Sequence, residues 1–256
     1  AGLGDCVDDG DLFEAPWQVL DNAMDIIENP VTTNLPDGLP YGLAVGNHDQ
    51  TANGNADGTT NYYNQYFGTG RFGTRGYFGG NYGSNNDNHF DLFSAAGMDF
   101  IVIYFEYDTT PDAAVITWAE NLLQTYSSRR AIIVSHWIIN TGNPGSFSTQ
   151  GQTMYNAFRD NPNVFLMLAG HVPGEGRRTD IYNGNTIHSV LSDYQSRTNG
   201  GNGWLRIMEF DPAANMINVK SYSPYLNQFE EDGDSQFSLP YTMTGIGDAP
   251  FVELGS

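Results

Sequence analysis

Apolar residues recur at two different spacings along this chain, and each spacing predicts a different kind of secondary structure. Residues 14–29, 112–127 and 149–160 place apolar side chains three and four positions apart, which is the spacing of an amphipathic helix. Pro111 and Asp112 stand at the start of the second segment, where such residues favour the first turn of a helix. The pattern therefore predicts a helix in each of these segments.

Continuous or alternating apolar runs predict a larger number of strands. The predicted strands are residues 41–45, 98–107, 129–136, 163–171, 185–195, 203–211 and 216–224. Helices separate most of the earlier strands, whereas the last three strands follow one another directly. This order predicts an α/β fold, a two-sheet mixed β-sandwich flanked by helices.

The segment 49–97 has no regular apolar pattern and is rich in Gly, Asn and Tyr. We expect one long loop there, and loops of that length in compact domains are usually functional or disordered. Part of it, residues 61–82, is either a wall for substrate or a surface meander packed on its own aromatic rings.

We expect residues 1–256 to form a single domain, with a core at 1–225 and a C-terminal extension at 226–256 toward a further domain. The opening AGLGDCVDDG is typical of the end of a strand followed by an acidic loop. It predicts at least one more strand upstream, so we expect this sequence to be a piece of a longer chain.

The amino-acid composition limits which binding partners and which cellular locations are expected for this protein. The chain has 10 Lys and Arg against 30 Asp and Glu, a net charge of −20, which argues against nucleic acid or anionic membrane as partner. This balance suits a secreted or salt-tolerant protein, or one that gathers cations. We expect an extracellular or periplasmic protein, and the chain itself carries no signal peptide. No apolar run is long enough to span a bilayer. Cys6 is the lone cysteine, so an internal disulfide is excluded, and the oligomeric state stays open.

Polar groups that can bind a metal ion follow four of the apolar segments. These residues are Asp5, then Asn47, His48 and Asp49, then His136, and finally His171. In open α/β sheets the ligand site lies beyond the carboxyl ends of the strands, so these side chains are predicted to converge. Oxygen and imidazole donors without thiolate suit a divalent ion such as Mn, Fe, Zn, Mg or Ca. The plainer alternative is that the histidines cap strand ends and that Asp5 is a turn residue.

At these residues the sequence resembles a known family. GDCVDD, residues 4–9, is similar to the GDxxD motif of calcineurin-like metallophosphoesterases, and GNHD, residues 46–49, is similar to their GNH[DE] motif. His136 in IIVSH and His171 in LAGHVPGEG are similar to the two later histidine motifs. The text SDYQSRTNGGNGWLRIMEFDP is similar to large secreted bacterial members of this family.

The resemblance implies a four-layer αββα fold and a metal-dependent hydrolase of phosphate mono- or diesters that uses a metal-bound hydroxide. The implied metal ligands are Asp5, Asn47, His136 and His171. Asp5 would bridge two ions, and the other three would complete the shell of the second ion. His48 would be the general acid for the leaving alkoxide or would stabilise the phosphoryl oxygens. Asp49 would orient His48 within hydrogen-bond distance and hold it protonated. The implied partner is a small-molecule phosphate ester.

Two departures from the family pattern concern the first metal ion. The family carries an early Asp-x-His or Asp-x-Gln motif on its first strand, and nothing precedes Ala1 here. Pro173 stands where the family's last histidine would be. We therefore expect one well-formed metal site and a second, incomplete one, in which a water molecule or Glu175 fills the gap.

Two other functions stay open on the sequence alone. A degenerate relative would bind one ion and serve as a binding or structural module of a larger secreted protein. A metallohydrolase of non-phosphate esters would reuse the same metal-activated water.

Other polar residues have plainer interpretations. His89 is expected at the entry to a strand, and His188, inside an apolar strand, as a core histidine. No cationic neighbour is evident to lower the pKa of Cys6, so we expect this thiol to pack rather than react. Arg177 and Arg178 are expected in a loop, facing solvent rather than phosphate.

Overall fold

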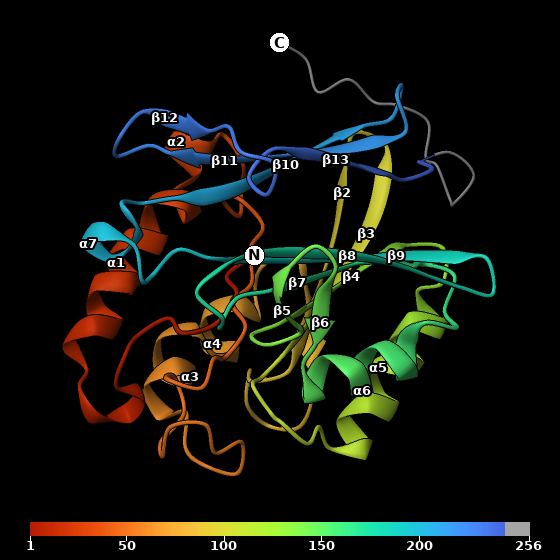
Figure 1. The fold of residues 1–256 in the computed structure, drawn as a ribbon. Helices are drawn as coiled ribbons and strands as arrows, with labels where there is room; N and C mark the ends of the chain where they lie inside the picture. The colour runs from red at the N-terminus through yellow and green to blue at the C-terminus, as the bar shows by residue number, and fades with distance from the viewer. Residues whose placement is uncertain (244–256) are drawn as a thin grey trace.

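The larger of two β-sheets forms the centre of the molecule (Figure 1), in a computed structural model that describes residues 1–243. This sheet has nine strands in the order β1-β2-β3-β4-β7-β9-β8-β5-β6. Their bounds are β1 Phe78–Asn81, β2 His89–Ala95, β3 Met98–Phe105, β4 Arg130–Ser135, β5 Ile139–Gly142, β6 Gly145–Phe147, β7 Val164–Ala169, β8 Gly174–Tyr182 and β9 Asn185–Asp193. Strands β3, β4, β7 and β9 run parallel, whereas β2 and β8 run antiparallel to their neighbours β3 and β9. The sheet is therefore mixed.

A smaller antiparallel sheet lies over one face of the larger one (Figure 1). Its strands are β10 Leu205–Asp211, β11 Met216–Ser223, β12 Gln228–Glu230 and β13 Phe237–Pro240. β11 is central, because β10, β12 and β13 all pair with it.

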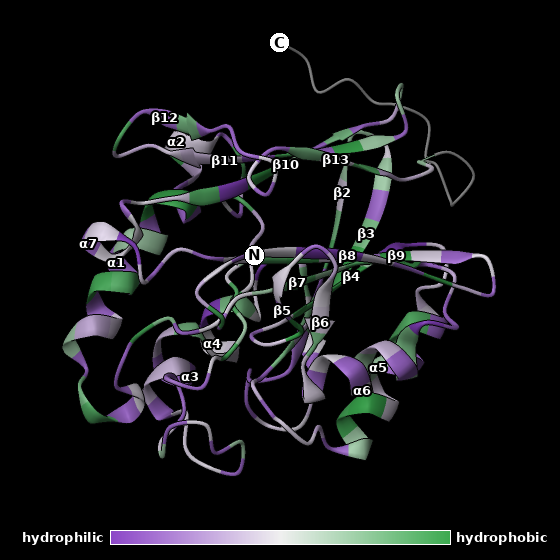
Figure 2. Ribbon diagram, viewed as in Figure 1, coloured by the Kyte–Doolittle hydropathy of each residue, from purple (hydrophilic) through white to green (hydrophobic). Residues whose placement is uncertain are grey.

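The core follows from the alternation of side chains along the strands of the large sheet. Phe100 and Val102 of β3 belong to a buried cluster with Ile217 and Val219 of the small sheet. Ile101 and Ile103 instead belong to a cluster with residues of helices α5 (Ala113–Thr125) and α6 (Thr149–Phe158). In Figure 2 helices α5 and α6 carry both green and purple stretches, as amphipathic helices do. One face of the large sheet is thus covered by helices and the other by the second sheet.

The predicted fold class is confirmed: the chain is a mixed α/β protein with two sheets and flanking helices. The predicted helices correspond to α1 (Ala15–Glu28), α5 and α6, and the long apolar runs correspond to β3, β4, β7, β9, β10 and β11. The remaining short helices are η1 Gly10–Leu12, α2 Pro30–Thr33, α3 Asn61–Phe67, α4 Thr69–Phe72 and α7 Thr198–Gly201.

The prediction of one long loop at 49–97 is wrong. That segment contains α3, α4, β1 and β2. Tyr63, Phe67 and Phe72 are buried in a cluster with Trp17 of α1, and Tyr63 and Phe67 are spaced by one helical turn. Buried aromatic side chains stabilise this segment. The prediction failed because the high Gly and Asn content of the segment suggested a loop. His89 begins β2, as expected, and is only 1% exposed.

Other boundaries also differ from the expectation. Residues 41–45 are buried and extended, but they pair with the chain start through one parallel bridge, Gly2 to Leu43, rather than as a strand. Arg177 and Arg178 lie in β8 rather than in a loop. β12 and β13 fall within the expected C-terminal extension and pair with β11, and residues 244–256 lie outside the described part.

Among the described residues, none of the helices combines the length and the apolar character that crossing a membrane requires.

Candidate metal centre

The ends of β4 and β7 bring two histidines to the same edge of the large sheet. Val134 of β4 pairs with Leu168 of β7, so His136 and Gly170 are level just beyond the two strands. The Gly170 N–H donates to the His136 carbonyl at 2.9 Å and continues the pairing past both strands. His171 follows directly. The parallel arrangement therefore delivers both imidazoles to one edge, as the sequence predicted.

Asp5 reaches this edge from the segment at the chain start, through an unusual backbone. Asp5 has φ +50° and His171 has φ +70°, both in the left-handed region that costs a non-glycine residue about 1–3 kcal/mol. Gly46 lies so close that a Cβ there would collide with the main-chain nitrogen and the carboxylate of Asp5. Strain and close approach at these positions indicate that the placement of Asp5 and His171 is constrained by the fold.

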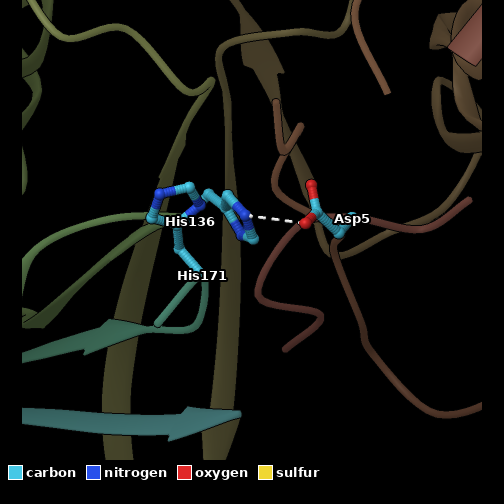
Figure 3. A group of neighbouring side chains, drawn as sticks. All are labelled: Asp5, His136 and His171. Atoms are coloured by element: carbon cyan, nitrogen blue, oxygen red, sulfur yellow. Dashed lines mark ion pairs between the residues drawn. The ribbon is translucent and has the colours of Figure 1, made fainter. Parts of the chain in front are cut away.

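Figure 3 shows Asp5 and His136 facing one another, with His171 beside them. Ligand atoms of these three side chains all lie within 4.8 Å of one another, so they can hold one metal ion. Their ligand atoms come from three separate segments of the chain, which only the fold brings together.

The hydrogen bond at the far side of His136 fixes which nitrogen faces Asp5. Its Nδ1 lies 2.7 Å from the Leu3 carbonyl, which can only accept, so Nδ1 carries the proton in the neutral ring. Nε2 lies 3.1 Å from Asp5 Oδ2 and makes no hydrogen bond in the described structure. An imidazole lone pair and a carboxylate oxygen are thus held together in a site where His136 is 2% exposed. Such a pair of acceptors requires a cation, either a proton or a metal ion.

Asn47 extends this set toward a fourth ligand. Its Nδ2 donates to Asn53 Oδ1 at 3.0 Å, which turns Oδ1 toward the centre. That Oδ1 lies 2.9 Å from His171 Nδ1. Two ligand atoms at right angles on one ion, each 2.0–2.2 Å from it, are about 3 Å apart. The separation fits a shared ion as well as it fits a direct hydrogen bond.

Electrostatic interactions favour the forms of Asp5 and His171 that are able to bind metal. Burial alone would raise the pKa of Asp5, but the contact with His136 and the His48 N–H, which donates to Oδ1 at 3.0 Å, outweigh it and lower that pKa. Burial lowers the pKa of His171, and the His136 ring lowers it further, against the opposing pull of Asp5. A charged carboxylate and a neutral imidazole are the states in which these groups bind metal.

His48 is oriented by a different acid from the one predicted. Its Nδ1 lies 2.8 Å from the Asp8 carbonyl and 3.0 Å from Asp8 Oδ1. Asp49 is fully buried and accepts from Gly46 N at 2.8 Å and Val7 N at 3.1 Å. The expectation that Asp49 orients His48 through a hydrogen bond is therefore wrong, because its carboxylate is used to join two loops.

The surroundings of His48 and Asp49 shift their pKa values for different reasons. Burial of the His48 ring, which alone would lower its pKa, is outweighed by the Asp8 carbonyl and by the charges of Asp5 and Asp8, so the pKa of His48 is raised. Burial raises the pKa of Asp49 to about 6, against the hydrogen bonds that it accepts. Burial also raises the pKa of the neighbouring Cys6 thiol, in line with a packing role.

Glu175 does not fill the gap that Pro173 leaves. Its carboxylate pairs with Arg206 and, at 3.1 Å, with Arg197, and it accepts from Tyr194 at 2.9 Å. Ser221 and Ser235 donate to it as well. The acid is thus committed to the contact between the two sheets, and the expectation that it replaces the missing ligand is wrong.

Asp193 is a residue at this site that the sequence argument passed over. Ala169 of β7 pairs with Leu191 of β9, so Asp193, the last residue of β9, is level with His171. Asp193 is 9% exposed, and its Oδ2 has no partner in the described structure. It lines a cavity of about 270 Å³ together with the three ligands. The polar end of β9, Ser192 and Asp193 after the apolar Val190 and Leu191, is the sequence feature that could have predicted Asp193 at this site.

Two aromatic rings border the histidines and were also not predicted. The Tyr107 ring is 5.3 Å from that of His171, and the Trp137 ring is 5.0 Å from it. Tyr107 and Trp137 stack with an interplanar angle of 12°. By contrast, His188 is a core residue as expected, because it lies between Thr179 Oγ1 and the Pro240 carbonyl, each 2.9 Å away.

Comparison with known proteins gives relatives for the chain. No family model matches it. It is 33% identical over 252 residues to the uncharacterized protein YvnB of Bacillus subtilis (strain 168), which covers 92% of this chain. The chain spans only 18% of the length of that relative.

Two solved structures resemble the chain more distantly. One is a dimetal phosphatase from Danio rerio, with a TM-score of 0.38 and 11% identity, covering 61% of this chain and 62% of that one. The other is GAP50, the anchor in the inner membrane complex of Plasmodium, with a TM-score of 0.39 and 13% identity, covering 60% of this chain and 53% of that one. Likenesses this distant carry no conclusion about the chemistry of this chain.

Proposed function

We propose that this chain hydrolyses phosphate mono- or diesters with a divalent cation held by Asp5, Asn47, His136 and His171. The observation that supports this most is the buried pair of acceptor atoms, His136 Nε2 and Asp5 Oδ2, 3.1 Å apart. Oxygen and imidazole donors favour Mn, Fe, Zn or Mg over soft metals. The GDxxD and GNHD motifs, which supply two of the four ligands, add support from the sequence.

Other residues of the chain have separate roles in the proposed reaction. When bound, a divalent ion polarises a phosphoryl oxygen and makes water a stronger acid. His48 stands next to Asn47, with Nδ1 held by Asp8, so its Nε2 is the nitrogen left to protonate the leaving oxygen. The His48 side chain is 35% exposed, which leaves it open to substrate. Tyr107 and Trp137 form an aromatic border beside the ligands.

A one-ion module without catalysis is the second candidate. It is favoured by the contacts of Glu175, which leave this acid unable to replace the missing metal ligand at Pro173. The side chain of Pro173 has no atom that can bind a metal ion, and the Glu175 carboxylate is already paired with Arg197 and Arg206. Asp193 is the remaining carboxylate in the cavity that can support a second ion. A module of this kind would bind one ion and a ligand without cleaving the ligand.

Hydrolysis assays separate these functions. The protein is loaded with Mn²⁺ and offered nitrophenyl phosphate, bis-nitrophenyl phosphate and nitrophenyl acetate, before and after EDTA treatment. We expect hydrolysis of a phosphate substrate that EDTA abolishes and Mn²⁺ restores. Hydrolysis of the acetate alone would support the non-phosphate ester, and bound Mn²⁺ without any hydrolysis would support the one-ion module.

A further inference from the structure

The cavity of about 270 Å³ at the metal centre has no lysine or arginine in its lining among residues 1–243. The two arginines nearest to the lining in the sequence are Arg197 and Arg206. Arg197 pairs with Glu175 at 3.1 Å and with Glu230 at 2.6 Å, and Arg206 pairs with Glu175 as well. The charge of each guanidinium is thus offset by a carboxylate before a phosphoryl group enters the cavity.

Two carboxylates belong to the lining instead. They are those of Asp5 and Asp193, and Asp193 takes part in no ion pair within the described part of the chain. One divalent cation brings two positive charges, which these two carboxylates offset. His48 adds a positive charge when it is protonated, but the Asp8 carboxylate lies 3.0 Å from its Nδ1 and offsets that charge. The centre with one ion is therefore close to neutral before substrate binds.

This charge balance matters because the two classes of phosphate ester differ in charge. A phosphate monoester carries about two negative charges above pH 7, since its second pKa is about 6. A diester has no second ionisable oxygen and carries one negative charge. In a cavity lined in this way the second charge of a monoester has no partner, and a charge without a partner is costly to remove from water. The lining therefore favours a monoanionic ester.

Part of the lining is apolar and offers a surface for a second organic group. Leu3, Tyr194 and Trp204 line the metal cavity and also a larger cavity of about 430 Å³ between the two sheets. That larger cavity is lined mainly by apolar side chains of both sheets, such as Leu168 and Met208. A neutral ester group can lie against such a surface, whereas a charged oxygen there would lose its water without gaining a hydrogen-bond partner.

We propose that this centre selects phosphodiesters and discriminates against phosphomonoesters, with the second ester group on the side of Tyr194 and Trp204. The inference rests on the proposed function, because it names the substrate class of the same site. Asp193 enforces the preference, since its carboxylate repels the second charge of a monoester. Gln195 is exposed and also belongs to the lining, so it is the position at which an added cation would relieve that repulsion.

Binding is tested first, without catalysis. Phenylphosphonate, a dianion at about pH 8.5, and its methyl ester, a monoanion, are titrated into the Mn²⁺-loaded protein and followed by calorimetry. We expect the methyl ester to bind more tightly. Asp193→Asn removes the charge and keeps the oxygen that accepts from the Gln195 N–H at 3.0 Å, so it should strengthen phenylphosphonate binding about tenfold relative to the methyl ester.

Gln195→Lys adds a positive charge at an exposed position of the lining and should shift the ratio of the two affinities in the same direction. Gln124→Lys, which adds the same charge at an exposed position of α5 outside the lining, is the matched control and should leave the ratio unchanged. Weaker phenylphosphonate binding in Asp193→Asn would mean that this acid supports a metal ion, and would overturn the inference.

The substrate arm compares nitrophenyl phosphate with methyl nitrophenyl phosphate, which have the same leaving group. We expect kcat/KM to favour the diester by about tenfold or more, and Gln195→Lys to shift the ratio toward the monoester by about tenfold. A higher kcat/KM for the monoester, or a ratio that Asp193→Asn and Gln195→Lys leave unchanged, overturns the inference and keeps the proposed function. Tighter binding of the methyl ester without hydrolysis of either substrate would overturn the proposed function and keep the selection by charge.

Discussion

His136 holds Asp5 Oδ2 at 3.1 Å with one ring nitrogen and the Leu3 carbonyl at 2.7 Å with the other. Leu3 and Asp5 belong to the same short segment, so the segment that orients the imidazole also supplies the carboxylate. This coupling explains why the ring nitrogen that makes no hydrogen bond faces the Asp5 carboxylate in a buried place. A change that moves the segment should therefore disturb orientation and ligation together.

Gly46→Ala tests that coupling. The added Cβ would collide with the Asp5 main chain and carboxylate, so we expect a loss of about 1–3 kcal/mol in stability and weaker metal binding. Thermal unfolding with and without Mn²⁺ measures both. Gly70→Ala is the matched control, because a Cβ there meets no atom within 4 Å. An Mn²⁺-induced rise in Tm that is equal in both variants would contradict the role of Gly46.

His48→Asn should lower kcat for a phosphate ester by about 100-fold or more, because it removes the proton donor. Asp8→Asn should cost only a few-fold, since the Asp8 main-chain carbonyl still holds Nδ1 at 2.8 Å and its carboxylate is 89% exposed. Steady-state kinetics under saturating Mn²⁺ measure both. Equal rates in His48→Asn and the unmodified chain would remove His48 from the mechanism.

Glu175→Gln should destabilise the protein and leave metal binding intact. The variant leaves the buried Arg206, whose side chain is 7% exposed, without its charge partner, which costs about 3–5 kcal/mol. Chemical denaturation measures the loss, and the Mn²⁺ content of the folded variant is the control. A folded Glu175→Gln with less bound metal would show that this acid serves the metal centre after all.

The pH dependence of the stability of Glu106→Gln distinguishes the effect of the Glu106 charge from the effect of side-chain packing. Burial raises the pKa of Glu106 to about 7, so the folded chain holds a proton there that the unfolded chain releases at lower pH. The stability that this group contributes is therefore complete in acid and is lost as pH rises toward and through 7. We expect the variant to match the unmodified chain in stability at pH 4, below the ordinary pKa of 4.5, and to exceed it at pH 8. A stability difference that does not change with pH would contradict a raised pKa at Glu106.

The apolar runs predicted which edge of the sheet His136 and His171 share. β4 and β7 are mostly apolar, and the polar residues that follow, Ser135 and His136 for β4 and His171 for β7, mark the ends of the strands. Parallel pairing then places those ends at one edge. The polar end of β9, Ser192 and Asp193, would have pointed to Asp193 in the same way had it been weighed as the others were.

The partners of individual acids could not be predicted in the same way. Asp49 and Asp8 both lie near His48, and only the three-dimensional course of two loops decides that Asp49 is used for backbone N–H groups. Glu175 similarly meets Arg206, which lies on a different sheet. Long-range pairing of this kind has no local pattern in the sequence.

The central claim is tested most directly by counting metal ions per chain. The protein is incubated with Mn²⁺, desalted gently and analysed by inductively coupled plasma mass spectrometry, next to the variant in which His136 and His171 are both changed to Ala. We predict about one or more equivalents of Mn²⁺ in the unmodified chain and almost none in the variant while it keeps its fold by circular dichroism. Equal metal content in both proteins, or none in the unmodified chain, would contradict the assignment of Asp5, His136 and His171 as a metal centre.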